Sequence, residues 1–350
     1  HGWPRASAML APRGRLPAFV AACALLAGAH GCDSCGSSTP EVVVYTSVDQ
    51  VFSEPVFRAF EESSGLRVRA VYDTEETKST GVLNRLIAEG ENPQADVFWS
   101  GDPVRPFQLV GRGFVEPYVS PAAAGLPETA RAADGTWTGF AARARVLLVN
   151  RARVPAEDTP RSVRDLASPR WRGATAIANP LFGTTTMHVG AWFATWGEAD
   201  TRAFLDSLRA NDVRIVSSNG EVRRLVSAGE VAFGLTDTDD ANEAIREGAD
   251  VEVVYPDQDG IGTLVMPTSV VLIRGAPHPE PARRLIDYLL SAEVEAMMAE
   301  RAAHMPLRAG VPVPAGLRSG ADIVPMHIDY TRVAEEMQSQ QEWLREWVGL

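Results

Sequence analysis

The sequence is poor in cysteine and has no long run of basic residues. Only three of its 350 residues are cysteine, which excludes a small fold held together by a disulfide framework. The 33 lysines and arginines are outnumbered by 45 aspartates and glutamates, and the formal net charge is −12. Such a chain lacks the clustered positive charge that attracts a phosphate backbone. Nucleic acid is therefore not expected among its partners.

Long hydrophobic runs are also missing after the first 31 residues. From Cys32 onward no apolar run approaches the roughly 18 residues of a membrane-spanning helix. Hydrophobic residues nevertheless make up 45% of the chain, which excludes a largely disordered protein. At about 150 residues per domain, the length predicts two domains, each with its own core.

Residues 1–31 have the pattern of a signal peptide. Arg13 and Arg15 form a positive region, and a charge-free apolar stretch over 16–29 follows it. As a helix this stretch would span about 21 Å, less than the roughly 30 Å of a hydrocarbon core. Export is therefore predicted. The small, polar segment 32–40 is predicted to be a flexible tether.

Gly31-Cys32, preceded by small residues, resembles the bacterial lipobox. In that motif the cysteine is lipidated and becomes the new N-terminus. The resemblance implies a periplasmic protein whose lipidation site is Cys32 and whose contact with the membrane is the lipid anchor alone. The alternative is ordinary cleavage, which would leave Cys32 and Cys35 as a pair of thiols in the tether.

The pattern of the mature chain predicts an α/β fold. The apolar run over 42–45 is typical of a strand buried on both faces. A helix is expected next, with Ser53 as its N-cap and Gly65 as its C-cap. Further strands are predicted over 66–72, 96–99, 146–149, 174–178, 213–216, 231–235, 251–255 and 264–273. Further helices are predicted over 80–89, 185–195, 199–210, 221–228, 281–290 and 293–302.

This alternation indicates parallel sheets covered by helices, and two α/β lobes fit the number of elements. We expect 41–140 with 264–350 to form the first lobe and 141–263 to form the second. The last twenty residues have the spacing of one amphipathic helix that docks on the body.

Polar residues follow several of the predicted strands. In open α/β sheets, ligands bind beyond the carboxyl ends of the strands. Each such residue alone would be read as a helix cap or a solvated turn, but several on the same rim favour a binding site. The candidates in the first half of the chain are Thr46, Ser47, Asp49, Glu75 and Asp102.

Three carboxylates follow the apolar run over 231–235. Asp237, Asp239 and Asp240 stand within four residues of one another. They repel one another unless a cation, an amine or several donors compensate them. Capping of the next helix would use one or two of them at most, so a role in ligand binding is predicted.

The segment 179–186 has the opposite chemistry. Gly183, Thr184 and Thr185 open a predicted helix, where free N–H groups and hydroxyls suit a phosphate, a phosphonate or a carboxylate. Asn219, ahead of another helix, could add a donor. Arg143 and Arg145 alternate along the chain and either flank the same anion site or pair with the surplus of acidic residues.

Motifs of known enzyme classes are mostly missing. The mature chain keeps His188, His278, His304 and His327, and no two stand at the spacing of metal ligands. The sequence contains no P-loop, no nucleophile elbow and no dinucleotide-binding glycine motif. A binding protein is therefore predicted rather than an enzyme. A phosphate-ester hydrolase and an envelope scaffold protein are the alternatives from other classes.

Several segments together resemble the ferric-ion-type solute-binding proteins of bacterial ABC importers, in the order in which that family has them. These segments are VVYTSVD at 43–49, ADVFWS at 95–100, WTGFAARARV at 137–146, Asn179-Pro180 with the Gly-Thr turn after it, and AGEVAFGL at 228–235. The resemblance covers about 41–307. It implies the type II periplasmic-binding-protein fold, with two lobes joined by crossing strands and a ligand cleft between them. It also implies delivery of the ligand to an ABC permease.

The resemblance places a metal site on carboxylates. The family has a histidine where this chain has Asp49, and adjacent tyrosines where it has Asp239 and Asp240; a further carboxylate ligand matches Asp102. The family's anion site matches Gly183, Thr184, Thr185 and Asn219. Iron(III) or a related metal, bound with phosphate or carbonate, is therefore expected.

A second ligand class fits the same residues. A small organic phosphate or phosphonate would place its anion on 183–186 and its amine or hydroxyl groups on the aspartates. This alternative explains why the anion donors persist although the tyrosines are replaced, whereas iron has the support of the family. The protein is expected to act as a monomer.

Overall fold

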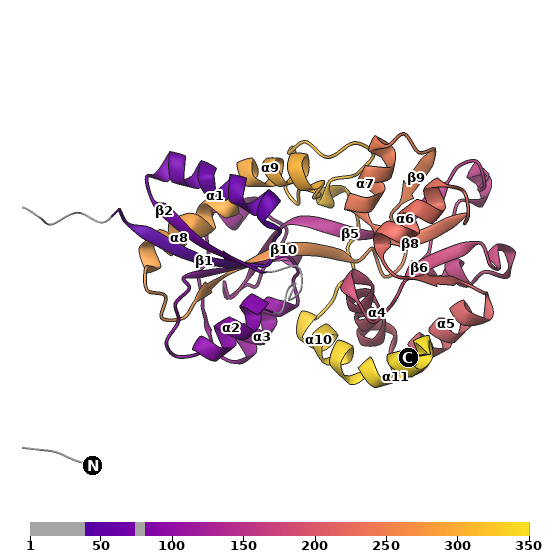
Figure 1. Cartoon of the computed structure of the whole chain (residues 1–350), viewed down its shortest axis with the longest axis horizontal. Helices are drawn as coiled ribbons and strands as arrows, with labels where there is room; N and C mark the ends of the chain where they lie inside the picture. Colours follow the sequence, from indigo (N-terminus) through magenta and orange to yellow (C-terminus); the bar gives the residue numbers. More distant parts are fainter. Residues whose placement is uncertain (1–38, 74–80, 350) are drawn as a thin grey trace, which may run out of the picture. The chain divides into compact units, whose positions relative to one another are not determined.

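The computed structural model describes residues 39–73 and 81–349, and within them helices and strands alternate along most of the chain (Figure 1). The strands are β1 (Glu41–Thr46), β2 (Arg67–Tyr72), β3 (Val97–Ser100), β4 (Val115–Glu116), β5 (Thr138–Asn150), β6 (Thr175–Ala178), β7 (Arg214–Val216), β8 (Phe233–Asp237), β9 (Val251–Val254) and β10 (Val265–Ile273). The α-helices are α1 (Gln50–Ser64), α2 (Gly81–Glu89), α3 (Arg105–Gly111), α4 (Gly183–Trp196), α5 (Glu198–Ala210), α6 (Asn219–Ser227), α7 (Thr238–Arg246), α8 (Pro279–Leu289), α9 (Ala292–Ala302), α10 (Tyr330–Ser339) and α11 (Gln341–Val348). None of these helices is long and apolar enough to cross a bilayer.

One long strand connects two groups of strands. The hydrogen-bonded order is β2-β1-β3-β10-β5-β8-β6-β7, with β4 on β10 and β9 on β5. The first half of β5 pairs with β10, and its second half pairs with β8 and β9. We call the group with β1, β2, β3, β4 and β10 the first lobe and the group with β6, β7, β8 and β9 the second lobe; Figure 1 shows β5 and β10 running between them.

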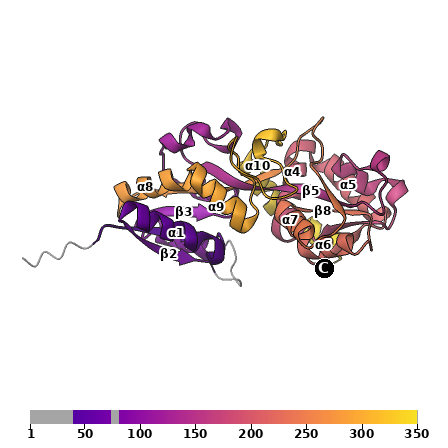
Figure 2. The same cartoon turned by 90° about the horizontal axis from the view of Figure 1, so that it is seen from above.

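The sheet of the first lobe is buried on both faces, as the apolar run at β1 predicts. Val42 and Val44 belong to the core beneath α1, α8 and α9, which lie side by side in Figures 1 and 2. Val43 and Tyr45 belong to a second core that includes residues of α2 and α3. Successive side chains of a strand point to opposite faces, so a strand between two layers must be apolar throughout.

The second lobe is built in the same way. In β5, Leu147 and Val149 pack with α4 and α5, whereas Val146 and Leu148 pack with α6 and α7. This arrangement positions the carboxyl end of β8 and the start of α4 beside the same stretch of β5. Helices on both faces of a sheet in each lobe confirm the predicted α/β class. The predicted parallel sheets are mixed instead, because the crossing strands β5 and β10 run antiparallel to β8 and β3.

One local prediction is wrong, and another is right but too short. Helix α1 begins at Gln50 with Asp49 at the N-cap position, so Ser53 lies inside the helix, where its hydroxyl donates to the Val48 and Asp49 carbonyls. The strand expected over 146–149 is present as part of the much longer β5. Gly65, by contrast, ends α1 with a positive φ of 71°, as its C-cap prediction requires.

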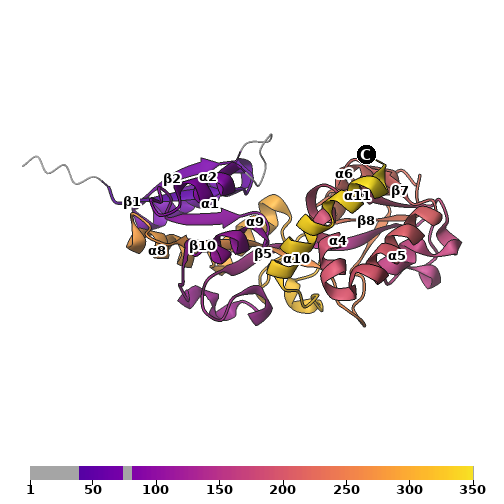
Figure 3. The same cartoon turned by 90° about the horizontal axis from the view of Figure 1, so that it is seen from below.

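The C-terminal segment forms two helices instead of the one expected. Gln340 lies between α10 and α11. Figure 3 shows these two helices in yellow, with α10 beside α4. Leu344 and Trp347 of α11 belong to the core with Leu147 and Trp192 of the second lobe. The expected division into 41–140 with 264–350 and 141–263 stays a prediction. Helix α11 belongs to the range 264–350 that was expected in the first lobe, although it packs on the core of the second. The predicted signal peptide 1–31 and nearly all of the tether 32–40 lie outside the described residues.

A buried carboxylate fixes a bulge in β5. The pairing register of β5 and β10 shifts at Pro267/Thr268, and Ala141, which the register skips, has a φ of 44°. Glu295 of α9 has no exposed surface and accepts hydrogen bonds from the backbone N–H groups of Ala141, Leu307 and Arg308 at 3.0, 2.8 and 3.0 Å. The carboxylate therefore ties α9 to the crossing strand and to the segment after α9.

Glu295→Ala should destabilise the fold by about 2–4 kcal/mol in urea unfolding, because three backbone N–H groups, two of them fully buried, lose their acceptor. Glu300→Ala, an exposed position on the same helix, is the control and should change stability by less than about 0.5 kcal/mol. Equal effects of the two substitutions would contradict the assigned role of Glu295.

Candidate functional site

A cavity of about 1050 Å³ is lined by residues from both lobes. The loops after β1 and β3 contribute Ser47, Asp49 and Asp102, and β5 contributes Arg143. The second lobe contributes residues from the starts of α4, α6 and α7, and His304 comes from the segment after α9. The remaining charged groups on the wall are Arg105, Asp237, Asp239, Asp240, Glu243, Arg246, Glu247 and Arg301. Acidic groups outnumber basic ones there, which favours a ligand that carries positive charge.

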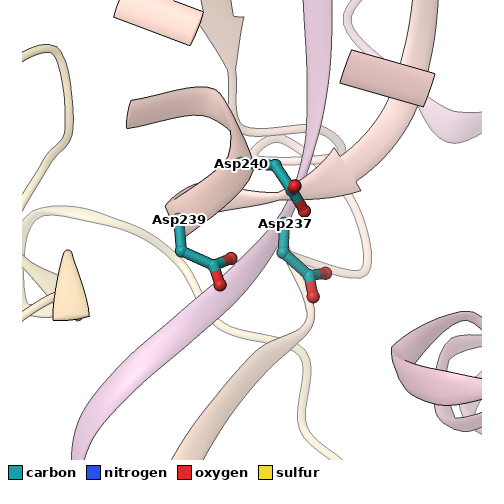
Figure 4. Close-up of side chains that lie close together, drawn as sticks. All are labelled: Asp237, Asp239 and Asp240. Atoms are coloured by element: carbon teal, nitrogen blue, oxygen red, sulfur yellow. The ribbon is translucent and has the colours of Figure 1, made fainter. Parts of the chain in front are cut away.

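Three aspartates form a compact cluster on this wall. One carboxylate oxygen from each of Asp237, Asp239 and Asp240 lies within 4.8 Å of the others. Figure 4 shows the three side chains beside one another where β8 passes into α7. Oxygen atoms at this separation could reach a common metal ion, so the cluster is a candidate cation site.

The local sequence explains why the three carboxylates gather. Every residue of β8 is buried, and the strand ends with Asp237, which is the N-cap residue of α7. The side chain of Asp237 makes no capping hydrogen bond. It turns toward β5, and Asp239 and Asp240 in the first turn of α7 complete the cluster. Capping, the alternative reading of these residues, does not account for the orientation of Asp237.

Arg145 holds Asp237 in place. This arginine has no exposed surface, and its Nη1 donates to Oδ1 of Asp237 at 2.7 Å. Nη1 also lies 3.1 Å from Oγ1 of Thr184 and 3.0 Å from Oδ1 of Asn219, and Nη2 donates to Oγ1 of Thr185 at 3.1 Å. Thr184 in turn donates to Asp237. One buried guanidinium therefore links β5 to β8, α4 and α6.

The ring of His188 closes this network. Its Nδ1 accepts from Nε of Arg145 at 3.4 Å. Burial, and then the charge of Arg145, holds the pKa of His188 well below its usual range. The imidazole is therefore neutral at physiological pH and can serve as an acceptor.

Arg143 lies on the cavity side of the same network. Its Nη1 is 3.4 Å from Oδ2 of Asp237, and the side chain is 23% exposed. Burial lowers the pKa of Arg143, but the attraction of Asp239, Asp237, Asp102 and Asp240 outweighs it, and the pKa is raised overall. The acidic wall therefore keeps this guanidinium charged.

Asp239 and Asp240 are not neutralised in the same way. Among the described residues, no Lys or Arg nitrogen lies within 4.0 Å of either carboxylate, and Oδ1 of Asp239 is buried without a hydrogen-bond partner. Burial raises the pKa of Asp239. Burial, followed by repulsion from Asp239 and Asp237, raises the pKa of Asp240 to about 7. A bound cation would relieve all of these costs.

Two further buried polar atoms without a partner lie on the cavity wall. They are Oγ1 of Thr186, in the first turn of α4, and Nδ1 of His304. Burial, with help from the charge of Arg143, lowers the pKa of His304 to about 3, so this ring is neutral. Buried polar groups in folded proteins nearly always have partners. Their position on the wall therefore supports a ligand site.

Most of the sequence-predicted site residues line this one cavity. These are Ser47, Asp49, Asp102, Arg143, Gly183, Thr184, Asn219, Asp237, Asp239 and Asp240. Thr46 and Thr185 do not line the cavity. Thr46 is buried and donates to the Trp99 carbonyl, and Thr185 is buried against Arg145. Glu75 and Cys32 lie outside the described residues.

The four expected metal ligands are only partly brought together. Asp239 and Asp240 belong to the cluster, but Asp49 and Asp102 are not in the one such group that the described residues form. Asp102 pairs with the Arg105 guanidinium and accepts from the backbone N–H of Val104 at 2.9 Å. In the described chain, Asp237 is the third member of the group instead. The sequence predicts Asp237 as a ligand-binding residue, but the resemblance does not include it among the expected metal ligands.

Some lining residues were missed by sequence reasoning. His304 and Arg301 come from the end of α9 and the residues after it, where no strand end points to a ligand site. Arg105 opens α3, a helix that the pattern did not predict. None of these positions carries a local signal, because only the tertiary fold brings them to the cavity.

Two lobes with strands crossing between them, and a polar cavity lined by both, define the class of solute-binding proteins. A family model described as "Bacterial extracellular solute-binding protein" matches residues 92–332. The chain therefore belongs to that family, whose members are binding proteins.

Individual relatives agree with this assignment. Iron uptake protein A1 of Synechocystis sp. is 29% identical over 83% of this chain and 85% of its own length. A periplasmic protein of Salmonella paratyphi A, named for 2-aminoethylphosphonate binding, is 25% identical over 85% of this chain and 83% of its own. The Trichodesmium structure (IdiA, FutA) with iron and citrate covers 88% of this chain and 99% of its own, at 22% identity and a TM-score of 0.76. That likeness confirms the predicted two-lobed periplasmic-binding-protein fold.

Arg145→Met should destabilise the protein by about 3–5 kcal/mol, because it leaves the Asp237 carboxylate buried without its main partner. Adding Asp237→Asn to Arg145→Met should recover part of this loss. Urea unfolding of the two single variants and the double variant gives the coupling energy. Additive effects would show that the two side chains do not stabilise each other.

The raised pKa of Asp240, about 7, predicts a pH dependence for the ligand-free protein. Between about pH 4 and pH 7 the folded state keeps a proton that the unfolded chain has lost, so stability falls as the pH rises through this range. Asp240→Asn removes that loss. The variant should exceed the wild type in stability at pH 8 by more than about 1 kcal/mol, and the difference should shrink toward pH 4. Parallel stability profiles would exclude a perturbed Asp240.

Proposed function

We propose that this solute-binding protein captures iron(III) or a related hard metal cation and delivers it to the permease of an ABC importer. The observation that supports the proposal most is the cluster of Asp237, Asp239 and Asp240, in which Oδ1 of Asp239 is buried and has no hydrogen-bond partner. Carboxylate oxygens are hard ligands that suit such cations. The names of two relatives, for iron uptake and for bound iron with citrate, point to the same ligand class.

The ligand set would differ from a tyrosine site. None of the residues that line the cavity in the described chain is a tyrosine. The carboxylates of Asp239 and Asp240 stand where the resemblance to ferric-ion-type proteins implies tyrosines. Metal binding would then depend on the ionisation of carboxyl groups with raised pKa values, and the affinity should fall as the pH drops below about 7.

A small organic phosphonate is the second candidate. The cavity of about 1050 Å³ is far larger than a metal ion needs. The N-terminal turn of α4, with the unpartnered hydroxyl of Thr186, offers donors to an anionic group. One relative is named for 2-aminoethylphosphonate. An amine of such a ligand would lie on the aspartates.

Delivery would take place outside the cytoplasm. Family membership supports an extracellular or periplasmic location, and we propose that a lipid on Cys32 tethers the protein near its permease. The protein would act as a monomer. Closure of the lobes on the ligand would then be the signal that the permease recognises.

Metal analysis tests the proposal. Wild-type protein incubated with the iron(III) nitrilotriacetate complex and then gel-filtered should retain one iron per chain, measured by plasma mass spectrometry. Asp239→Asn and Asp240→Asn should each weaken binding by more than about tenfold, because each removes a charged ligand. Glu243→Gln is the matched control. This carboxylate lines the same cavity on α7 but pairs with Arg223 at 3.5 Å, and its loss should leave iron binding unchanged.

Titration with 2-aminoethylphosphonate separates the two candidates. If the phosphonate binds with a one-to-one heat and no metal is retained, iron is the wrong ligand and the phosphonate proposal replaces it. If a variant that lacks both the Asp239 and the Asp240 carboxylate still retains iron, the aspartate cluster is not the metal site.

A further inference from the structure

The carboxylate of Asp237 is surrounded by donors. Its Oδ1 accepts from Arg145 at 2.7 Å and from Thr184 at 3.0 Å. Its Oδ2 accepts from Thr184 at 2.8 Å, from Asn219 at 3.3 Å and from Arg143 at 3.4 Å. The side chain is 3% exposed. Four side chains, from the helices α4 and α6 and from the crossing strand β5, therefore hold this one carboxylate.

These donors overlap with the set that the sequence assigns to an anion from solution. Thr184 and Asn219 were expected to bind phosphate or carbonate, with Arg143 beside them. In the structure the hydroxyl of Thr184 and the side-chain amide of Asn219 both donate to Asp237 instead. A second anion in the same place would lie against the Asp237 carboxylate, where two like charges in a buried site repel strongly.

The same carboxylate also faces the cation cluster. One of its oxygens lies within 4.8 Å of ligand atoms of Asp239 and Asp240. Asp237 therefore accepts from guanidinium, hydroxyl and amide donors and at the same time lies next to the candidate cation position. This is the place of an anion that bridges a cation to the donors of the protein.

We propose that Asp237 is a built-in counter-anion, so that the site binds its metal cation without phosphate, carbonate or another free anion. The proposal rests on the proposed function, in which the cluster takes a metal cation. Arg145 neutralises Asp237 at 2.7 Å, whereas no Lys or Arg nitrogen of the described residues lies within 4.0 Å of the Asp239 and Asp240 carboxylates, whose negative charge attracts the cation. Asp237 thus fixes the specificity of the site for a bare cation over a metal–anion pair.

Native mass spectrometry of the wild-type protein tests the proposal directly. The protein is loaded from iron(III) nitrilotriacetate in carbonate-free buffer, with and without added phosphate. The expected complex has the mass of protein plus one iron in both buffers, with no mass of phosphate, carbonate or nitrilotriacetate. Complexes that contain iron only together with an anion would overturn the proposal and leave the proposed function standing. Absence of iron from both samples would overturn both.

Asp237→Ala should convert the site into one that needs a free anion. The vacated space and its donors would accept acetate or phosphate, so iron binding should fall by more than about tenfold in anion-free buffer and recover when acetate is added. Asp240→Ala is the matched control. Among the described residues its carboxylate receives one side-chain hydrogen bond, from Thr236 at 3.1 Å, and no Lys or Arg nitrogen lies within 4.0 Å of it to hold acetate, so no recovery is expected. Recovery in both variants, or in neither, would contradict the special role of Asp237.

A phosphorus NMR titration without metal gives an independent readout. The phosphorus resonance of phosphate should broaden when folded Asp237→Ala is added, because phosphate binds, and it should remain sharp when the wild type is added. If Asp237→Ala does not fold, Asp237→Asn fills the same space without charge. It should lose iron binding with no recovery in acetate, and wild-type iron affinity in Asp237→Asn would overturn the proposal.

Discussion

Arg145, on the strand β5 that connects the two lobes, has no exposed surface, and the rest of the site depends on how its charge is compensated. A buried guanidinium is costly unless its donors all find acceptors. Arg145 finds them in Asp237, Thr184, Thr185, Asn219 and His188. Because these partners come from β8, α4 and α6, one ion pair sets the relative positions of the elements that open onto the cavity. The acid cluster is placed by the same contact.

The division of charge follows from this pair. Asp237 is buried and compensated, and Asp239 and Asp240 beside it lack a basic partner at contact distance in the described chain. Their raised pKa values express the cost of holding them close together without a cation. A bound cation would remove the repulsion between these carboxylates, and the free energy gained in this way would add to the affinity for the cation. Binding, rather than catalysis, is what such an arrangement does best.

Much of the fold could be predicted because hydrophobic periodicity reports burial directly. The run at 42–45 is buried on both faces of β1, and Gly65 ends α1 with positive φ. The failures have physical causes. Ser53 looked like an N-cap, but the chain enters the helix earlier, at Asp49, and the hydroxyl bonds back to that turn. The length of β5 was hidden because its first half carries alanines and arginines, which have no strand signal of their own.

The sequence predicts which residues line the site, but not the hydrogen bonds and ion pairs that connect them. Polar residues after the parallel strands β1, β3, β6 and β8 do converge on the cavity, as their common direction within each lobe requires. The pairing of Arg145 with Asp237 could not be read from the sequence, since it depends on which way a residue at the end of β8 turns. His304 was missed for a similar reason, because only the tertiary fold brings it to the wall. The most direct measurement is a crystal structure of iron-loaded protein with anomalous diffraction at the iron edge. We predict one peak within about 2.5 Å of oxygens of Asp239 and Asp240, with Asp237 still held by Arg145; a peak elsewhere, or none, would contradict the account.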